Sequence, residues 1–232
     1  MKKHHALTLL LALLLLTAAA DGRAQTVSKD SPPPVALQEQ GPAGQGRLEG
    51  ETYSNDFFGI SFSTPRGWLA QDTAMKKEII DSGKKIFDEG TATAGERAKI
   101  EAALQRTYFL LSVSKYDLKT PPPGAFNAQV SFIAERVPTA IVKTGGDYLT
   151  QMLRVSRSSS ATLELNGPIR TRNVGGVSFS AADVRLTVGM LAVEQKYLAT
   201  IKNGYALLFA FSYADEPDAK TFEEIVNSIK FK

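Results

Sequence analysis

The first regular pattern of apolar and polar residues along the chain is a strict alternation in residues 58–63. Alternate positions are large and apolar, namely Phe58, Ile60 and Phe62, and the positions between them hold glycine or serine. This period of two predicts a strand with one buried face. The Pro-Arg-Gly sequence at residues 65–67 is typical of a turn. We expect this turn to return Trp68, the single tryptophan, to the same core.

Residues 72–106 change to a helical spacing. Apolar residues recur three, four or seven positions apart: Met75, Ile79, Ile80, Ile86 and Phe87, and then Ile100, Ala103 and Leu104. Glycine residues at both ends of residues 90–95 interrupt the pattern. The spacing therefore predicts two helices separated by a break.

The middle of the chain predicts two strands followed by a helix. Residues 107–115 are apolar at both alternating sets of positions, which indicates a strand covered on both sides. After the prolines of residues 121–123, residues 126–135 place Phe126, Val130 and Phe132 on one face only. We therefore expect a strand with a single buried face. The helix is expected to begin near residues 144–147, to bury Tyr148, Met152 and Val155, and to end at the serines 158–160.

The last third predicts a meander and a final helix. Val177–Val188 is expected to form a strand with a bulge near Ala181, because its apolar phase changes between Phe179 and Ala182. Residues 191–201 follow, and Asn203-Gly204 is a strong signal for a two-residue hairpin turn. Tyr205–Tyr213 places aromatic residues on one face and small residues on the other. The final helix is expected to be capped by Asp215 or Glu216, to hold Pro217 in its first turn, and to bury a stripe of apolar residues: Phe222, Ile225, Val226 and Ile229.

The N-terminal residues predict export. Residues 1–24 have a positive start at Lys2 and Lys3, an apolar core, and small residues suited to cleavage after Ala20 or Ala24, which is the pattern of a signal peptide. Residues 25–50 are rich in Pro, Gly and Gln, and predict a flexible linker. The globular domain is therefore expected to span residues 51–232. We expect a periplasmic or secreted protein with no membrane anchor after cleavage.

Composition narrows the possible chemistry. Cleavage after Ala24 removes Lys2, Lys3 and Arg23 but only one acid, Asp21, so 24 basic and 23 acidic residues remain of the 27 and 24 in the full chain. This near-neutral balance does not favour nucleic acid as a partner. The two histidines, His4 and His5, lie in the predicted leader, and cysteine is absent. Catalysis and metal binding by His or Cys are thereby excluded from the mature chain, and we expect no cofactor. Chemistry based on carboxylates alone remains possible.

Several groups of polar residues are candidates for a site, and each also has a structural interpretation. Asp215, Glu216 and Asp218 are the densest acidic group. They favour the start of a helix, with cation binding as the open alternative.

Asp183 and Glu194 are expected to pair with Arg185 and Lys196 across a hairpin. The glycine pairs 145–146 and 175–176 indicate turns rather than phosphate loops. Four arginines are candidates for a basic patch: Arg154, Arg157, Arg170 and Arg172.

The two ends of the chain resemble the PsbP-like family. The motifs are Tyr-x-Asn at residues 53–55, Phe-Gly-Ile-Ser-Phe at 58–62, Pro-x-Gly-Trp at 65–68, and Ser-Ile-Lys-Phe at 228–231. The resemblance implies an α+β fold, an antiparallel β-sheet with helices packed on both faces in an α/β/α sandwich. It implies no activity, because the motifs consist of packing and turn residues and members of this fold have unrelated roles. No site residue is carried over.

Three hypotheses of function follow. The favoured one is a non-catalytic, exported accessory or adaptor protein that binds another protein of the bacterial cell envelope through a sheet edge or a loop. The second is a periplasmic protein that binds a small ligand in a pocket between sheet and helices, lined by Trp68, Phe126 and Tyr205. The third is hydrolysis by a pair of carboxylates.

Overall fold

The computed structural model describes residues 43, 46–71, 106–118, 120–156, 161–188 and 191–232. The predicted leader and the two helices expected in residues 72–106 lie outside these residues, except for Arg106. The elements, in chain order, are β1 (Gly46–Glu49), β2 (Thr52–Asn55), β3 (Ile60–Ser63), β4 (Leu69–Ala70), β5 (Thr107–Ser114), β6 (Gln129–Arg136), α4 (Gly145–Ser156), β7 (Ala161–Leu165), β8 (Arg170–Val174), β9 (Val177–Val188), β10 (Leu191–Lys202), β11 (Tyr205–Tyr213), α5 (Glu216–Ser228) and β12 (Lys230–Phe231). β1 lies within the segment expected to be a linker.

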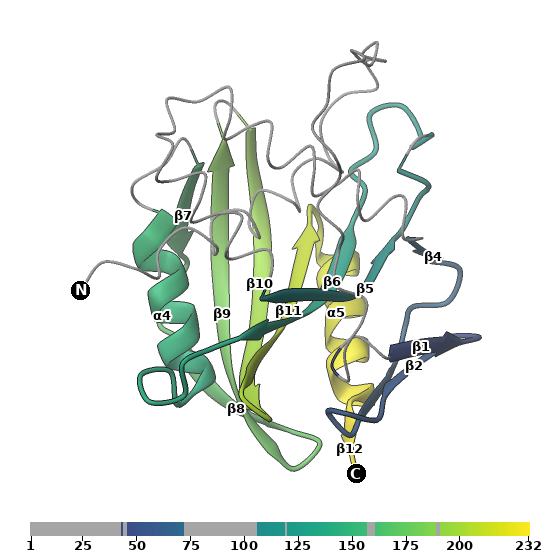
Figure 1. The fold of residues 1–232 in the computed structure, drawn as a ribbon. Helices are drawn as coiled ribbons and strands as arrows, with labels where there is room; N and C mark the ends of the chain where they lie inside the picture. Colours follow the sequence, from purple (N-terminus) through teal and green to yellow (C-terminus); the bar gives the residue numbers. More distant parts are fainter. Residues whose placement is uncertain (1–42, 44–45, 72–105, 119, 157–160, 189–190) are drawn as a thin grey trace, which may run out of the picture.

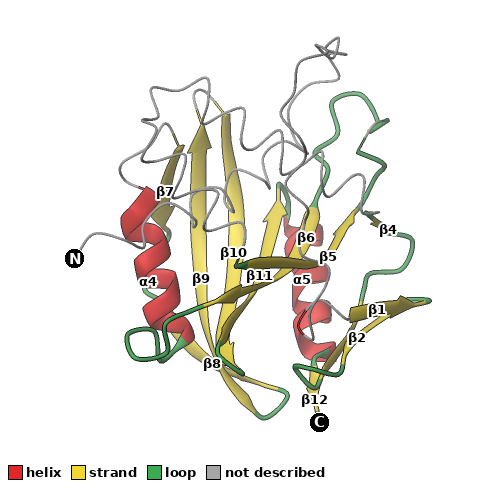
Figure 2. Cartoon of the chain, in the orientation of Figure 1, coloured by secondary structure: helices red, strands yellow, loops and turns green. Residues whose placement is uncertain are grey.

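The described strands form two antiparallel sheets. The smaller has the order β1-β2-β3-β12, and the larger has the order β4-β5-β6-β11-β10-β9-β7, with β8 also paired to β9. Figure 1 shows α4 beside β7 and β9, and α5 beside β11 with β12 at its C-terminal end. The two described helices are red in Figure 2, which shows how much of the fold is strand.

The larger sheet contributes side chains to two separate hydrophobic clusters. The α4 cluster joins four residues of α4 to Ala182, Val184 and Leu186 of β9; the four are Tyr148, Leu149, Met152 and Leu153. The α5 cluster joins three residues of α5, Phe222, Ile225 and Val226, to Val177, Phe179 and Ala181 of β9. Alternate residues of a strand point to opposite faces, so the odd-numbered residues of β9 can face the α5 cluster and the even-numbered ones the α4 cluster in a regular strand.

This arrangement corrects two of our expectations. The bulge predicted near Ala181 is wrong, because β9 pairs with β10 in continuous register from Ser180 to Val188. The change of phase arises because β9 is apolar toward one cluster in its first half and toward the other in its second. A register shift is found instead in β5, between Phe109 and Leu111.

The expectation of a single buried face in residues 126–135 is also wrong. Residues 129–134 of β6 are all buried, with Ile133 in the α4 cluster and Phe132 in the α5 cluster. Two of these buried residues, Gln129 and Ser131, are polar, and both contact Ser112 of β5. The Gln129 amide donates to Ser112 Oγ at 2.9 Å, and Ser131 Oγ lies 3.2 Å from the same oxygen. A pattern that counts only apolar residues misses such a face. In β5, residues 110–114 are buried at both alternating sets of positions, as predicted.

Apart from the bulge near Ala181, the last third follows the prediction. β9 and β11 have the predicted bounds, and the turn residues Asn203 and Gly204 have the positive φ values of 52° and 81° that a type I′ turn requires. The side chain of Asp215 accepts from the Asp218 backbone N–H at 2.9 Å and caps α5. The small residues of β11 lie in the α4 cluster, where α4 comes close. A Cβ atom on Gly145 would lie 1.9 Å from the Ala199 carbonyl oxygen.

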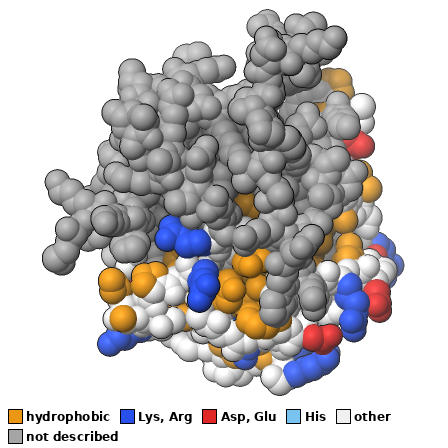
Figure 3. Space-filling model, in the orientation of Figure 1, with side chains coloured by type: hydrophobic (Ala, Val, Ile, Leu, Met, Phe, Trp, Pro, Cys, Tyr) orange, Lys and Arg blue, Asp and Glu red, His pale blue; other side chains and the backbone are white. Residues whose placement is uncertain are grey.

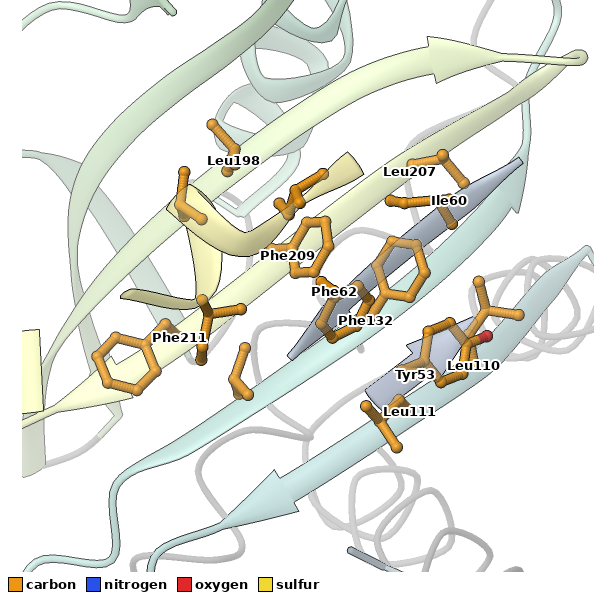
Figure 4. Close-up of a cluster of buried hydrophobic side chains, with 14 of the residues drawn as sticks. Tyr53, Ile60, Phe62, Leu110, Leu111, Phe132, Leu198, Leu207, Phe209 and Phe211 are labelled. Atoms are coloured by element: carbon orange, nitrogen blue, oxygen red, sulfur yellow. The ribbon is translucent and has the colours of Figure 1, made fainter. Parts of the chain in front are cut away.

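The two sheets meet through aromatic rings in the α5 cluster. Figure 4 shows Phe62 of β3 against Phe132 of β6 and Phe209 of β11. The centroid of the Phe62 ring lies 5.3 Å from that of Phe132 and 5.0 Å from that of Phe209, both edge to face. Such geometry is the favourable one for aromatic pairs.

Asn55 closes the turn that leads into this contact. Its side chain is buried, and Nδ2 donates to the Ala43 carbonyl at 2.9 Å while Oδ1 accepts from the Phe58 N–H at 3.2 Å. One amide thus satisfies a buried donor and a buried acceptor of the backbone. The Tyr-x-Asn part of the family motif has a structural role here.

We expect Asn55→Ala to lower the free energy of unfolding by roughly 3 kcal/mol, because it leaves both backbone groups without a partner. Ser54→Ala, at the neighbouring and less buried position, is the control and should change it by less than about 0.5 kcal/mol. Denaturant titration of both variants measures this. A loss of under about 1 kcal/mol in Asn55→Ala would contradict the assigned role.

Candidate functional site

The hairpin of β9 and β10 carries charged residues in facing positions. Asp183 is opposite Lys196, and Arg185 is opposite Glu194. Lys196 Nζ donates to Asp183 Oδ1 at 2.8 Å, and Arg185 Nε donates to Glu194 Oε1 at 2.7 Å. The predicted cross-strand pairing is therefore confirmed for all four residues.

β8 adds two arginines to this charged region. Arg170 donates from Nη2 to Asp183 Oδ2, so Asp183 accepts from two cations. Arg172 Nη1 donates to Glu223 Oε2 of α5 at 2.6 Å, and its Nη2 donates to the Asn227 side chain at 3.2 Å. Of the four arginines predicted as a patch, these two lie together on β8. Arg157 and the side chain of Arg154 lie outside the described part of the chain.

A cavity of about 270 Å³ lies among β8, β9, β10 and α5. Its floor is apolar and is formed by Ala181, Leu198 and Phe222. Leu198 and Phe222 belong to the α5 cluster, and Ala181 packs against it. Its rim is charged, with five residues that belong to the ion pairs described above: Arg170, Arg172, Asp183, Lys196 and Glu223. The cavity is thus an apolar hollow surrounded by ionised groups.

Lys196 is the most deeply buried cation of this rim. Burial by itself would lower the pKa of its ammonium, but the hydrogen bond and the charge of Asp183 outweigh burial and raise the pKa above its usual value. Lys196 Nζ also lies 5.6 Å from the centroid of the Tyr213 ring, within range of a cation–π contact. Lys196 is therefore charged at neutral pH.

The aromatic residues expected to line a pocket lie elsewhere. Trp68 stacks on Phe211 at 6.1 Å, and Tyr205 meets the edges of Phe57 and Phe58 at 5.8 and 5.5 Å. Phe126 packs against both clusters. The structure does not bring these three predicted residues together, and none of them lines the cavity beside α5.

The acidic residues at the start of α5 have different partners. Asp215 caps the helix, and Asp218 is buried and accepts from Lys115 Nζ at 2.8 Å. Across the residues that the structure describes, no group of three or more His, Cys, Asp or Glu side chains is placed to hold a metal ion. The capping predicted for Asp215 is confirmed.

The two glycine pairs serve the backbone. Gly175 and Gly176 have φ values of 57° and 82° and form the turn between β8 and β9, as predicted. Gly145 and Gly146 begin α4 rather than a separate turn.

Space-filling Figure 3 shows basic and acidic side chains side by side at the lower right, over the smaller sheet. The ion pairs there join Arg47 to Glu49 and Asp56, and Lys232 to Asp56.

Glu135, at the end of β6, is a titratable residue that no sequence pattern singled out. Tyr148 of α4 donates its hydroxyl to Glu135 Oε2 at 2.9 Å, and both residues line a small hollow of about 30 Å³ with Arg106. Burial raises the pKa of Glu135 to about 7, although the Tyr148 hydrogen bond and the Arg106 charge oppose the rise. The available signal was an acid in a strand whose other positions are mostly apolar.

Glu135 should make stability depend on pH. Its pKa is about 7 in the folded chain and near 4.5 in the unfolded chain, so its contribution is complete below pH 4.5 and is lost as pH rises through 7. We expect the free energy of unfolding of the wild type to fall by roughly 3 kcal/mol over this window because of Glu135, and we expect this fall to be absent in Glu135→Gln. Glu164→Gln, at an exposed acid, is the control. Parallel pH profiles for the wild type and Glu135→Gln would contradict the shift.

No helix in the described residues is long and apolar enough to cross a membrane.

Comparisons with known proteins concern the fold. No protein-family model matches the chain, and no curated protein matches it. Among solved structures, the chain is similar to cyanobacterial PsbP (CyanoP) from Synechocystis sp. PCC 6803, with 15% identity and a TM-score of 0.46 over 83% of this chain and 100% of that one.

Two further structures are similar over part of their length. A protein from Bacteroides thetaiotaomicron has 10% identity and a TM-score of 0.40 over 80% of this chain and 49% of that one. LpqN, involved in cell envelope biogenesis of Mycobacterium tuberculosis, has 11% identity and a TM-score of 0.35 over 75% and 83%. The first of the three is a PsbP protein, of the family that the motifs at the ends of this chain resemble.

Proposed function

We propose that this chain is an exported, non-catalytic accessory or adaptor protein of the bacterial cell envelope. Residues 1–24 serve as its signal peptide. Its linker is the part of residues 25–50 that precedes Ala43, because Ala43 is buried in the α5 cluster and β1 belongs to the smaller sheet. The domain is a PsbP-like sandwich with α4 and α5 on opposite faces of the larger sheet. The memberships of the α4 and α5 clusters support this layering. It binds an extended segment of another envelope protein.

The carboxylates of the cavity support a non-catalytic role. Asp183 and Glu223 line the same cavity, which is the setting that hydrolysis by two acids requires. Each accepts hydrogen bonds from cations, Asp183 from Arg170 and Lys196 and Glu223 from Arg172. Glycoside hydrolysis needs one carboxylic acid that donates its proton. Neither residue is arranged as that donor.

The observation that carries the proposal is the outer edge of β7. This strand pairs with β9 and with no other strand among those described. The Asn166 N–H donates to the Asp183 carbonyl at 2.8 Å, so in the antiparallel ladder the N–H groups of Leu163 and Leu165 point away from β9. Leu165 is 42% exposed. Such an edge suits the addition of a strand from a partner.

A crosslinking experiment in the native envelope tests this proposal. A photo-reactive residue at Thr162, which is exposed on β7, should give one discrete adduct, and the same residue at Glu224 of α5 should give none. Leu165→Pro should abolish the adduct, because it removes an outward N–H without breaking the ladder to β9. Leu165→Ala keeps that N–H and is the matched control. An adduct that survives Leu165→Pro, or none at Thr162, would count against the adaptor role.

A second candidate function is the binding of a small ligand in the cavity beside α5. The specific observation in its favour is the volume of about 270 Å³ with an apolar floor and a charged rim. This is near the small end of the range for ligand pockets, about 300 to 1,000 Å³. The aromatic lining expected from the sequence is replaced by ion pairs.

A further inference from the structure

The rim of the cavity beside α5 has more positive than negative charge. Three of its residues are cations and two are carboxylates: Arg170, Arg172 and Lys196 against Asp183 and Glu223. The imbalance lies at Asp183, where one carboxylate accepts from both Arg170 and Lys196. One positive charge at this point therefore lacks a counter-charge within the rim.

Arg170 has donors to spare at this point. Among the described residues its guanidinium donates from Nη2 alone, to Asp183, although a guanidinium carries five N–H donors. Its side chain is 62% exposed, whereas that of Lys196 is 24% exposed. Arg170 thus reaches solvent at the mouth while Lys196 lies deeper. A negative group that enters the mouth meets both cations.

The apolar floor of the cavity favours a ligand with an apolar body. Leu198 and Phe222 are buried, with exposed fractions of 1% and 3%, and Ala181 offers only a methyl group. An apolar body placed here would remove its own surface from water. A volume of about 270 Å³ corresponds to about nine water molecules at about 30 Å³ each, or a ligand of roughly ten non-hydrogen atoms.

We propose that this cavity binds a small amphipathic carboxylate, with its apolar body on Ala181, Leu198 and Phe222 and its carboxylate received by Arg170 and Lys196. The inference rests on the second candidate function and specifies its ligand. The carboxylate supplies the charge that the rim lacks, and Arg170 binds it in the planar geometry that suits guanidinium and carboxylate. A cationic ligand meets the wrong sign of charge.

Three probes of one shape test the sign of the ligand charge. Calorimetry on the full chain compares 3-phenylpropionate with its neutral amide and with 3-phenylpropylamine. We expect the carboxylate to bind at least tenfold more tightly than the amide and the amine to bind least. Equal affinities for the carboxylate and the amide overturn the proposed anion site.

Variants then locate the binding. Arg170→Gln should weaken carboxylate binding at least fivefold and leave amide binding unchanged, whereas Arg170→Lys should retain most of the preference for the carboxylate. Ala181→Leu fills the floor and should weaken both probes. Arg66→Gln, which changes an arginine with a 91% exposed side chain outside the cavity, is the control for the loss of one charge. Fluorescence of Trp68 checks that each variant is folded.

The outcomes separate the ligand class from the function. Equal binding of all three probes, lost in Ala181→Leu, keeps a ligand-binding function and overturns the carboxylate. Binding that Ala181→Leu and Arg170→Gln leave unchanged overturns this cavity as the site. If no probe binds, both the carboxylate and the second candidate function are overturned, while the crosslinking at β7 still decides the adaptor role.

Discussion

The contact of Phe62 with Phe132 and Phe209 holds the two sheets of this protein together. These rings come from three strands, β3, β6 and β11, and lie within 5.3 Å of one another, with Phe132 and Phe209 stacked at 4.4 Å. Because the smaller sheet covers this part of the larger one, β6 and β11 are buried on both faces. The hairpin in residues 53–68 is therefore part of the core, and Asn55 fixes the turn on which its ring positions depend.

Burial on both faces also decides where charge is found. The middle strands hold few ionisable side chains, and Glu135, at the end of β6, shows the cost because burial raises its pKa to about 7. β8, β9 and β10 carry the paired charges, where Asp183 and Glu194 find cations across the ladder. Charge in this sheet is thus placed mostly in β8, β9 and β10, on the side of β11 away from β5 and β6.

Local patterns predicted the parts of the fold that depend on local geometry. The Asn203-Gly204 turn, the bounds of β11 and the Asp215 cap each follow from a few neighbouring residues. The sequence Arg-Thr-Arg-Asn-Val of β8 has no apolar alternation, and its arginines are partnered by residues of β9 and α5 that are distant in the chain. The pairing of Asp183 and Glu194 with cations across the hairpin was predicted. The cavity was not, because a cavity depends on how far α5 covers the sheet.

The extent of that coverage explains why the cavity is apolar below and charged above. Phe222 of α5 stacks on Phe211 of β11 at 5.1 Å, so the helix is held over the middle of the sheet and its next residue, Glu223, faces the margin. Beneath Phe222 the floor is still core, with Leu198 and Ala181, whereas two residues beyond Ala181 the same face of β9 presents Asp183. The apolar floor therefore lies where α5 covers the sheet, and the charged rim, with more cations than carboxylates, lies where that cover ends on the same face.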